Sequence, residues 1–169
     1  KWTIVDINKK SNPDIIASVE KLPFKNNTFD TIKATELFEH VEELELGIKE
    51  SVRVLKHGGN LVISTPFMFP IHSDPLDLQR ITSDKWKQLA IKFNLKPIVF
   101  DEQGYLFSHI SEIGRMLIVN VSFTPLRYLL YSLFPILDLF SLLDSTNFSK
   151  KSKIINKFVC GYFIVFKKL

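Results

Sequence analysis

The sequence predicts an α/β fold with a largely parallel sheet, and two observations carry this prediction. Short runs rich in β-branched residues recur along the chain, and stretches of ten or more residues with helical spacing separate several of them. A chain of 169 residues, 46% of them hydrophobic, is also long enough to bury one core. Strands that alternate with helices are typical of parallel sheets, in which ligands bind at the carboxyl ends of the strands.

Three short strands are expected in the N-terminal part of the chain. They span Trp2 to Asp6, Asp14 to Ala17 and Phe29 to Ala34. The segments between them are polar and rich in turn-forming residues, and Leu22 to Thr28 is expected to be a loop with its turn at the two asparagines.

The span Glu42 to Leu55 predicts an amphipathic helix, because its apolar residues recur every three or four positions. Acidic residues gather at its start and basic residues at its end, which suits the helix dipole. Gly58 and Gly59 are expected to end this helix as a C-cap pair. A strand over Asn60 to Thr65 follows and ends at Pro66.

A long loop is expected from Phe67 to Arg80. Thr82 or Ser83 then caps a helix that runs through Phe93. A strand is expected over Ile98 to Phe100, and a further strand over Tyr105 to Ile110. A helical stretch over Glu112 to Leu143 follows and is broken at Pro125 and Pro135. A polar loop over Ser145 to Lys153 and a last strand over Phe158 to Phe166 come after it.

Composition excludes several classes of protein. The single cysteine, Cys160, excludes a disulfide framework and a cysteine-cluster metal site. The net charge of +4 is small and the basic residues are scattered, which argues against nucleic acid as a partner. Four histidines lie in separate segments without metal-ligand spacing, so no metal site is expected. No run reaches about 18 uninterrupted apolar residues, and no leader-like segment is visible, so a cytoplasmic protein is expected.

Four segments of the sequence resemble one known family when taken in order. Residues 22–30 read Leu-Pro-Phe-Lys-Asn-Asn-Thr-Phe-Asp, residues 39–41 read Glu-His-Val, and residues 50–59 read Glu-Ser-Val-Arg-Val-Leu-Lys-His-Gly-Gly. The fourth segment consists of Pro66 followed by His72, Pro75, Asp77, Arg80 and Thr82. Together they resemble class I S-adenosylmethionine-dependent methyltransferases of type 11.

The resemblance implies a Rossmann-like sheet with helices on both faces. It also implies that the first strand and the first helix of the family are missing from this chain, because none of the six glycines forms the G-x-G turn that follows that strand. The seven residues between Asp6 and Asp14 are too few to hold a helix and a strand. We therefore expect an upstream segment in the natural protein, since the missing strand belongs in the middle of the family's sheet.

The cofactor that the resemblance implies is S-adenosylmethionine. Asp6 would end the family's second strand and hold the ribose hydroxyls, and a carboxylate can accept two hydrogen bonds from a vicinal diol. Ser18 stands where the family often has an acid that contacts the adenine amino group. The cofactor-binding positions that the resemblance implies are Asp6, Ile7, Ser18, Val19, Leu22, Thr35 and Glu36.

The acceptor side of the expected site involves two histidines and one ion pair. A methyl transfer needs a general base only where the acceptor must lose a proton. His40 and His72 are the candidate catalytic residues, although a histidine at a helix start can instead bond to backbone. Asp77 and Arg80 can bind a polar or anionic acceptor, or can form an internal clamp that orders their loop.

The chain is expected to be one domain over residues 1–169, with a helical apolar insertion over residues 112–153. Its segment 116–143 is too apolar for an ordinary surface helix, and three explanations remain open. It can be a lid over a hydrophobic acceptor, an interface in a homo-oligomer, or a peripheral contact with a membrane whose anionic lipids face the lysines at 150, 151 and 153.

Two functions follow as hypotheses. The first is S-adenosylmethionine-dependent methyl transfer to a small-molecule, carbohydrate or lipid-linked acceptor, at oxygen. The alternative is a non-catalytic methyltransferase-like module for protein or membrane-surface interaction, which the missing glycine turn and Ser18 favour.

Overall fold

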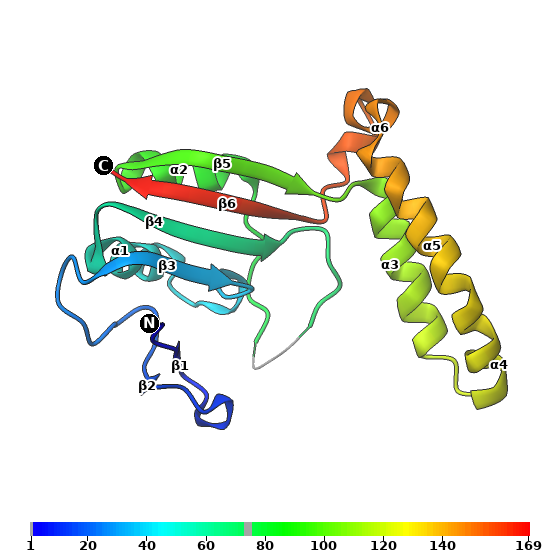
Figure 1. The fold of residues 1–169 in the computed structure, drawn as a ribbon, viewed down its shortest axis with the longest axis horizontal. Coiled ribbons are helices and arrows are strands. Elements are labelled where there is room, and N and C mark those ends of the chain that lie inside the picture. The colour runs from blue at the N-terminus through cyan, green and yellow to red at the C-terminus, as the bar shows by residue number, and fades with distance from the viewer. Residues whose placement is uncertain (1, 73–75) are drawn as a thin grey trace. The chain divides into compact units, whose positions relative to one another are not determined.

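Four strands form the larger sheet of the computed structural model, which describes residues 2–72 and 76–169 (Figure 1). They are β3 (Phe29–Thr35), β4 (Leu55–Pro66), β6 (Gly161–Lys168) and β5 (Leu95–Gln103), in this spatial order. Strands β3 and β4 are parallel, and in Figure 1 β6 runs opposite to its neighbours. The mixed sheet with helices confirms the α/β fold class, and the predicted strands at 29–34, 60–65, 98–100 and 158–166 all lie in it, with shifted ends.

A second, smaller sheet pairs β1 (Val5–Asp6) with β2 (Ile15–Ile16) in parallel. Both strands have two residues and are shorter than the sequence predicted. Among the described residues no strand pairs with both this sheet and β3. The position between β1 and β3 is where the resemblance to the family placed its first strand.

Helix α1 (Leu44–Val54) packs on β4 and buries the apolar face that its periodicity predicted. It ends at Val54 and β4 begins at once, so the predicted cap at Gly58 and Gly59 is wrong. The two glycines instead lie where the register between β3 and β4 shifts. Gly58 has φ +74°, and a Cβ on Gly59 would lie 2.9 Å from the Asp30 carbonyl oxygen.

Helix α2 (Ser83–Lys92) starts at the predicted cap, since the Thr82 hydroxyl accepts a hydrogen bond from the Lys85 N–H at 3.2 Å. It places Trp86 in the core of its unit, where the indole lies edge-on to Phe38 and near Phe166 of β6. Phe38 belongs to the short 3-10 helix η2 (Phe38–His40), which directly follows β3 and is thereby fixed to the core.

The chain divides into two compact units. The first holds both sheets with α1 and α2, and consists of residues 1–66, 71–101 and 162–169. The second unit consists of residues 67–70 and 102–161 and is helical. Its elements are α3 (Leu106–Val119), α4 (Thr124–Leu130), η3 (Tyr131–Leu133), α5 (Phe134–Ser141), η4 (Leu142–Ser145), α6 (Asn147–Lys151) and η5 (Ile155–Lys157).

The predicted strand at Tyr105 to Ile110 is wrong, because this segment begins α3. The Asp144 carboxylate accepts hydrogen bonds from the backbone N–H groups of Tyr105, Phe107 and Ser108 at 2.8, 3.3 and 2.7 Å. A carboxylate at this place satisfies the unpaired donors of a helix start. The cap comes from a residue 36 or more positions away, so local periodicity could not predict it.

Both predicted breaks are found in the α-helix: residues 120–123 separate α3 from α4 just before Pro125, and η3 separates α4 from α5 just before Pro135. The chain tightens into η3 and places Pro135 in the first turn of α5, where its missing N–H costs nothing. The predicted polar loop at Ser145 to Lys153 contains α6, which Thr146 caps. Thr124 to Ser145 forms one helical stretch that is long and apolar enough to cross a membrane, contrary to the expectation from uninterrupted apolar runs.

Candidate functional site

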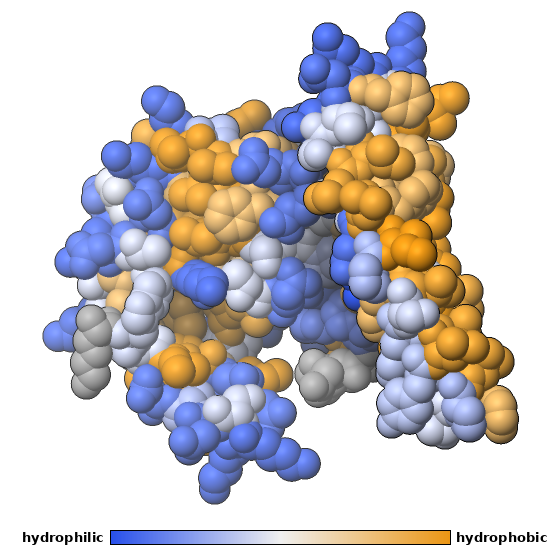
Figure 2. Space-filling view, turned by 45° about the vertical axis from the view of Figure 1, so that its right-hand side comes forward, coloured by the Kyte–Doolittle hydropathy of each residue, from blue (hydrophilic) through white to orange (hydrophobic). Residues whose placement is uncertain are grey.

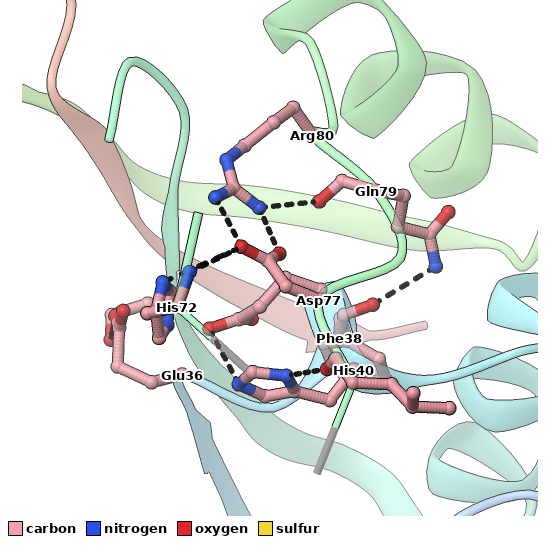
Figure 3. A network of polar contacts seen from close by, with 10 residues as sticks. Glu36, Phe38, His40, His72, Asp77, Gln79 and Arg80 are labelled. Carbon is pink, nitrogen blue, oxygen red and sulfur yellow. Dashed lines mark hydrogen bonds and ion pairs between the residues drawn. The ribbon is translucent and has the colours of Figure 1, made fainter. Parts of the chain in front are cut away.

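The segment after β4 docks onto the turn after β3 through hydrogen bonds to main-chain carbonyls, and Figure 3 shows the one from the Gln79 side chain to Phe38. The Glu39 carbonyl accepts from the N–H groups of Leu78 and Gln79 at 2.9 and 3.3 Å. The Gln79 side-chain amide donates to the carbonyls of Phe38 and Val41 at 3.0 and 2.8 Å. This latch brings together residues that lie about forty positions apart in the sequence, beside the ends of two parallel strands, where α/β folds bind ligands.

Asp77 and Arg80 form the internal clamp that the sequence offered as one alternative. Both terminal nitrogens of Arg80 donate to the two carboxylate oxygens of Asp77, the Nη2–Oδ2 bond being 2.6 Å. The His72 N–H donates to Asp77 Oδ2 at 3.0 Å, and only 2% of the Asp77 side chain is exposed. The Arg80 guanidinium therefore holds the pKa of Asp77 well below its usual range. Whether the pair also binds an acceptor stays a prediction.

The two candidate catalytic histidines lie next to each other. Their rings are nearly perpendicular with centroids 5.4 Å apart. His40 Nδ1 bonds to the Leu76 carbonyl, so this nitrogen carries the proton and Nε2 is the basic atom of the neutral ring. His72 Nδ1 lies 3.6 Å from Asp77 Oδ2, so the clamp also orients the second ring. The backbone contact expected of His40 and the proximity of His40 to His72 are thus both present.

Glu39 is the residue of this site that the sequence analysis assigned no role. Its side chain is fully buried, and neither carboxylate oxygen has a hydrogen-bond partner among the described residues. Oε1 lies 3.6 Å from His40 Nε2. Burial raises the pKa of Glu39, since the charged form loses its water. The available signal was the acid beside a histidine in the Glu-His-Val segment, but only the structure shows that it is buried.

Glu39, His40 and His72 together could hold a metal ion. One ligand atom from each of the three lies within 4.8 Å of the others. The sequence argument against a metal rested on the spacing of histidines, and spacing cannot detect ligands that two separate segments contribute.

Thr35 and Glu36 stand at the carboxyl end of β3, as predicted, and both are exposed. The Glu36 N–H donates to the Ser64 carbonyl at 2.9 Å, and the Ser64 hydroxyl donates to Glu36 Oε1 at 2.7 Å. Glu36 has φ +49°, a left-handed conformation that is uncommon outside glycine. The backbone therefore turns sharply here, which leads the chain directly into η2 and the histidines.

Asp6 and Ile7 lie at the end of β1. Asp6 Oδ1 accepts a hydrogen bond from the Asn8 N–H at 2.8 Å, which orders the turn. Among the described residues Oδ2 of Asp6 accepts no hydrogen bond, and the residue is half-exposed, so the carboxylate can still accept a bond from a ligand hydroxyl. Ile7 is exposed.

Ser18, Val19 and Leu22 lie in the segment after β2, which is fastened to α1. The Ser18 hydroxyl donates to Glu20 Oε2 at 3.0 Å, so it is already engaged locally. Val19 packs against Gly47, where an added Cβ would lie only 3.2 Å from the valine methyl group. The Leu22 N–H donates to Glu50 Oε2 at 3.0 Å. The segment thus has a fixed position, whereas its contact with a cofactor stays a prediction.

The predicted residues therefore form two groups. One group surrounds β1, β2 and the start of α1, and the other surrounds the ends of β3 and β4. The structure brings Glu36, His40, His72, Asp77 and Arg80 together. The negative charges of Glu36 and Glu39 both act on the Arg80 guanidinium, so these carboxylates lie near it. That the first group shares one crevice with the second stays a prediction.

Comparison with known proteins agrees with this architecture. Residues 4–63 match the family model described as a methyltransferase domain. The chain is 35% identical over 91 residues to the ubiquinone/menaquinone biosynthesis C-methyltransferase UbiE of Agrobacterium fabrum, a match that covers 54% of this chain and 33% of that protein. The chain thus spans between about a third and a half of the length of the curated relatives it matches.

Solved structures share the fold at low sequence identity. A candidate sarcosine dimethylglycine methyltransferase from Galdieria sulphuraria superposes with a TM-score of 0.57 at 15% identity, over 97% of this chain and 68% of that one. The [4+2]-cyclase SpnF superposes with a TM-score of 0.55 at 16% identity, over 92% of this chain and 56% of that one. Residues 4–63 thus match a methyltransferase domain, and the solved structures share the fold, which agrees with the resemblance of the sequence motifs to class I S-adenosylmethionine-dependent methyltransferases.

Proposed function

We propose that this chain is part of an enzyme that transfers a methyl group from S-adenosylmethionine to a small-molecule, carbohydrate or lipid-linked acceptor, at oxygen. The match of residues 4–63 to a methyltransferase domain is the observation that carries the proposal. The named relative UbiE is a C-methyltransferase, so the choice of oxygen rests on the residues of the acceptor side and not on that relative.

The chemistry of Asp6 fits the cofactor that this class uses. Its carboxylate stands at the end of a parallel strand, is half-exposed and is not buried in an ion pair among the described residues. Such a group can accept hydrogen bonds from the two ribose hydroxyls. S-adenosylmethionine supplies an already activated methyl group, so the protein has to position two reactants and exclude water. Ile7, Val19 and Leu22 would contribute the apolar side of that binding site, and Ser18 its hydroxyl.

The loop around Leu78 and Gln79, which is hydrogen-bonded to the turn after β3, would form the acceptor side of the site. A hydroxyl acceptor must lose its proton during the transfer, and a neutral imidazole is suited to promote this near neutral pH. His40 has its Nε2 as the basic atom, because Nδ1 is fixed by the Leu76 carbonyl. The Arg80 guanidinium, 23% exposed and paired with Asp77, would orient polar groups of the acceptor.

A binding titration with S-adenosylmethionine on the full-length protein tests the proposal. We expect binding below millimolar cofactor, and at least tenfold weaker binding by Asp6→Asn. Asp84→Asn is the matched control, because Asp84 is an exposed carboxylate paired only with Lys87 of its own helix. Absence of binding at millimolar cofactor would overturn the proposal and leave the non-catalytic module as the function.

A further inference from the structure

The first inference concerns the buried carboxylate of Glu39. A fully buried charge without a hydrogen-bond partner is costly, so a proton or a cation must compensate it. The nearest basic atom, His40 Nε2, lies at 3.6 Å, beyond hydrogen-bond length. With Glu39 ionised and His40 neutral, the carboxylate oxygen and Nε2 are two acceptors without a proton between them.

Both histidines of the cluster have the support that metal-binding imidazoles have in proteins. Such a ligand usually directs its second ring nitrogen to a carboxylate or a backbone carbonyl, which fixes the ring and raises its basicity. His40 directs Nδ1 to the Leu76 carbonyl, and His72 places Nδ1 on the side of the Asp77 carboxylate. In His40 the ligand atom is then Nε2, whereas His72 can offer either ring nitrogen.

The surrounding charges favour a cation. The carboxylates of Glu36, Glu39 and Asp77 lie close enough to interact with one guanidinium, that of Arg80, and Asp77 already neutralises it. Two imidazoles and one carboxylate suit Zn²⁺ and similar transition-metal ions, whereas Mg²⁺ and Ca²⁺ prefer oxygen ligands alone. Ligand atoms around a tetrahedral zinc ion are about 3.3 Å apart, so small side-chain rotations would close the present 4.8 Å spread.

We propose that Glu39, His40 and His72 form a binding site for a divalent transition-metal ion of the zinc type, with a coordination position left for a ligand. Its role in catalysis rests on the proposed function: a cation here would bind the acceptor hydroxyl and lower its pKa, so the imidazoles would act through the metal ion.

Calorimetric titration of the metal-stripped full-length protein with ZnCl₂ tests this site without cofactor or acceptor, so its outcome is independent of methyl transfer. We expect one zinc ion per chain, and at least tenfold weaker binding by Glu39→Gln and by His72→Gln. His109→Gln is the control, since this partly exposed histidine lies in the helical unit.

His72→Gln keeps the test valid if Glu39→Gln fails to fold, because His72 lies in a loop and is partly exposed. Absence of zinc binding by the parent protein, or equal binding by the parent and His72→Gln, would overturn the proposed site.

A second inference concerns the surface of the helical unit, and it rests on different residues. The helical stretch Thr124–Ser145 is 22 residues long, and its most apolar part lies outside any core. Figure 2 shows hydrophobic side chains along the length of this unit. The large apolar side chains that this stretch exposes are Leu126, Tyr128, Leu129, Leu133, Ile136, Leu139, Leu142 and Leu143. A face of this size is unusual on a protein surrounded by water.

Charged groups within the stretch are few and most of them are paired. Asp138 forms an ion pair with Arg115 of α3, and Asp144 caps the start of α3. The face directed away from α3 is therefore almost purely apolar. Residues 145–161 follow with four exposed lysines and no acidic residue, and the exposed side chains of Phe148 and Ile154 lie in the same segment. A long apolar face beside a lysine cluster complements an anionic lipid surface.

The stretch Thr124–Ser145 does not fit as a membrane-crossing helix, because helix α3 packs against it and is too short to cross with it. Helix α3 packs along α5, with Gly114 against Leu137 and the Ser111 hydroxyl donating to the Leu137 carbonyl at 2.8 Å. Residues 120–123 join α3 to the stretch Thr124–Ser145, so both would have to cross together. Helix α3 has 14 residues and spans about 21 Å, against about 30 Å of hydrocarbon, and it carries Glu112.

We propose that the helical unit binds the surface of a membrane rich in anionic lipids, with the stretch Thr124–Ser145 embedded in one leaflet and the lysines at 150, 151, 153 and 157 against the phosphates. Co-sedimentation with vesicles of phosphatidylcholine and roughly 30 mol% phosphatidylserine tests this surface. We expect binding to these vesicles, and at least tenfold less binding to vesicles of phosphatidylcholine alone.

Two variants and one control define the surface. Leu129→Glu with Leu139→Glu, and Lys150→Glu with Lys153→Glu, should each reduce vesicle binding at least tenfold. Ile91→Glu should leave it unchanged, because Ile91 is 83% exposed but lies on α2 of the other unit. Vesicle binding that survives both double variants would overturn the proposal. A dimer in gel filtration that Leu139→Glu dissociates, without vesicle binding by the parent, would assign the face to a second copy instead.

Discussion

Arg53 holds Glu50 one turn away on α1, and the same pair fastens the loop at Leu22 to that helix. Arg53 Nε and Nη2 donate to the two oxygens of Glu50 at 2.7 and 2.8 Å, and Arg53 also donates to the carbonyls of Leu22 and Phe24. Glu50 in turn accepts the Leu22 N–H. The structure shows that the two residues connect the segment after β2 to α1.

Replacing Glu50 by Gln should weaken this connection. The amide removes one charged acceptor and leaves the Arg53 guanidinium with fewer partners, so the free energy of unfolding should fall by about 1–2 kcal/mol. Urea denaturation followed by circular dichroism measures the change. Glu42→Gln is the control, because Glu42 is exposed and lies just before the same helix. Equal loss in both variants would contradict the connecting role.

The same carboxylate should make stability depend on pH. Hydrogen bonds from Arg53 lower the pKa of Glu50 below its ordinary 4.5. For an acid with a lowered folded-state pKa, the stabilisation is complete above the ordinary pKa and is lost as the pH falls through the folded-state value. The difference in unfolding free energy between the parent and Glu50→Gln should therefore be constant near neutral pH and shrink below about pH 4.5. Urea titrations at pH 7, 5 and 3.5 check this, and a difference that grows with acidification would contradict it.

Asp144→Ala should destabilise the helical unit without affecting the sheet unit. The carboxylate is 6% exposed and accepts three N–H groups at the start of α3. Loss of a helix cap costs about 1–2 kcal/mol. Hydrogen exchange should show faster exchange of the amides of residues 105–108, and unchanged protection of β4. Unchanged exchange at 105–108 would show that the cap contributes nothing.

Cys160 should react slowly with alkylating reagents. Burial raises the pKa of its thiol to about 11, and the nearby carboxylates of Asp144 and Glu112 act in the same direction. Since the thiolate is the nucleophile, alkylation by iodoacetamide at pH 8 should be at least tenfold slower than that of a cysteine peptide. The rate in urea provides the reference for the exposed thiol, and equal rates with and without urea would contradict this prediction.

Sequence patterns correctly predicted those structural features that depend on residues close together in the chain. The period of Glu42 to Leu55, the cap at Thr82 and the loop at Leu22 to Thr28 depend on residues close together in the sequence, and the structure places them as expected apart from the helix end at Val54. Pro75 of the fourth family segment lies outside the described residues. The errors have long-range causes. Asp144 turns the segment after Tyr105 into a helix start, and the pairing of β3 with β4 converts Gly58 and Gly59 from a cap into a register shift.

The candidate site shows the same division. His40, His72, Asp77 and Arg80 could be named from their segments, but the burial of Glu39 depends on the loop that closes over η2. A glutamate next to a histidine is usually solvated, so residue type alone does not signal a buried carboxylate. Only the hydrogen bonds from Leu78 and Gln79 to the Glu39 carbonyl show that the loop after β4 lies against this residue.

The latch between residues 76–80 and η2 has a consequence for how related proteins can diverge. Its bonds end on carbonyl oxygens of the main chain, which every amino acid carries. Side chains along the turn can therefore change from one relative to another while the loop keeps its anchor. The side chains that contact the acceptor can then differ between relatives while the strands of the sheet stay as they are.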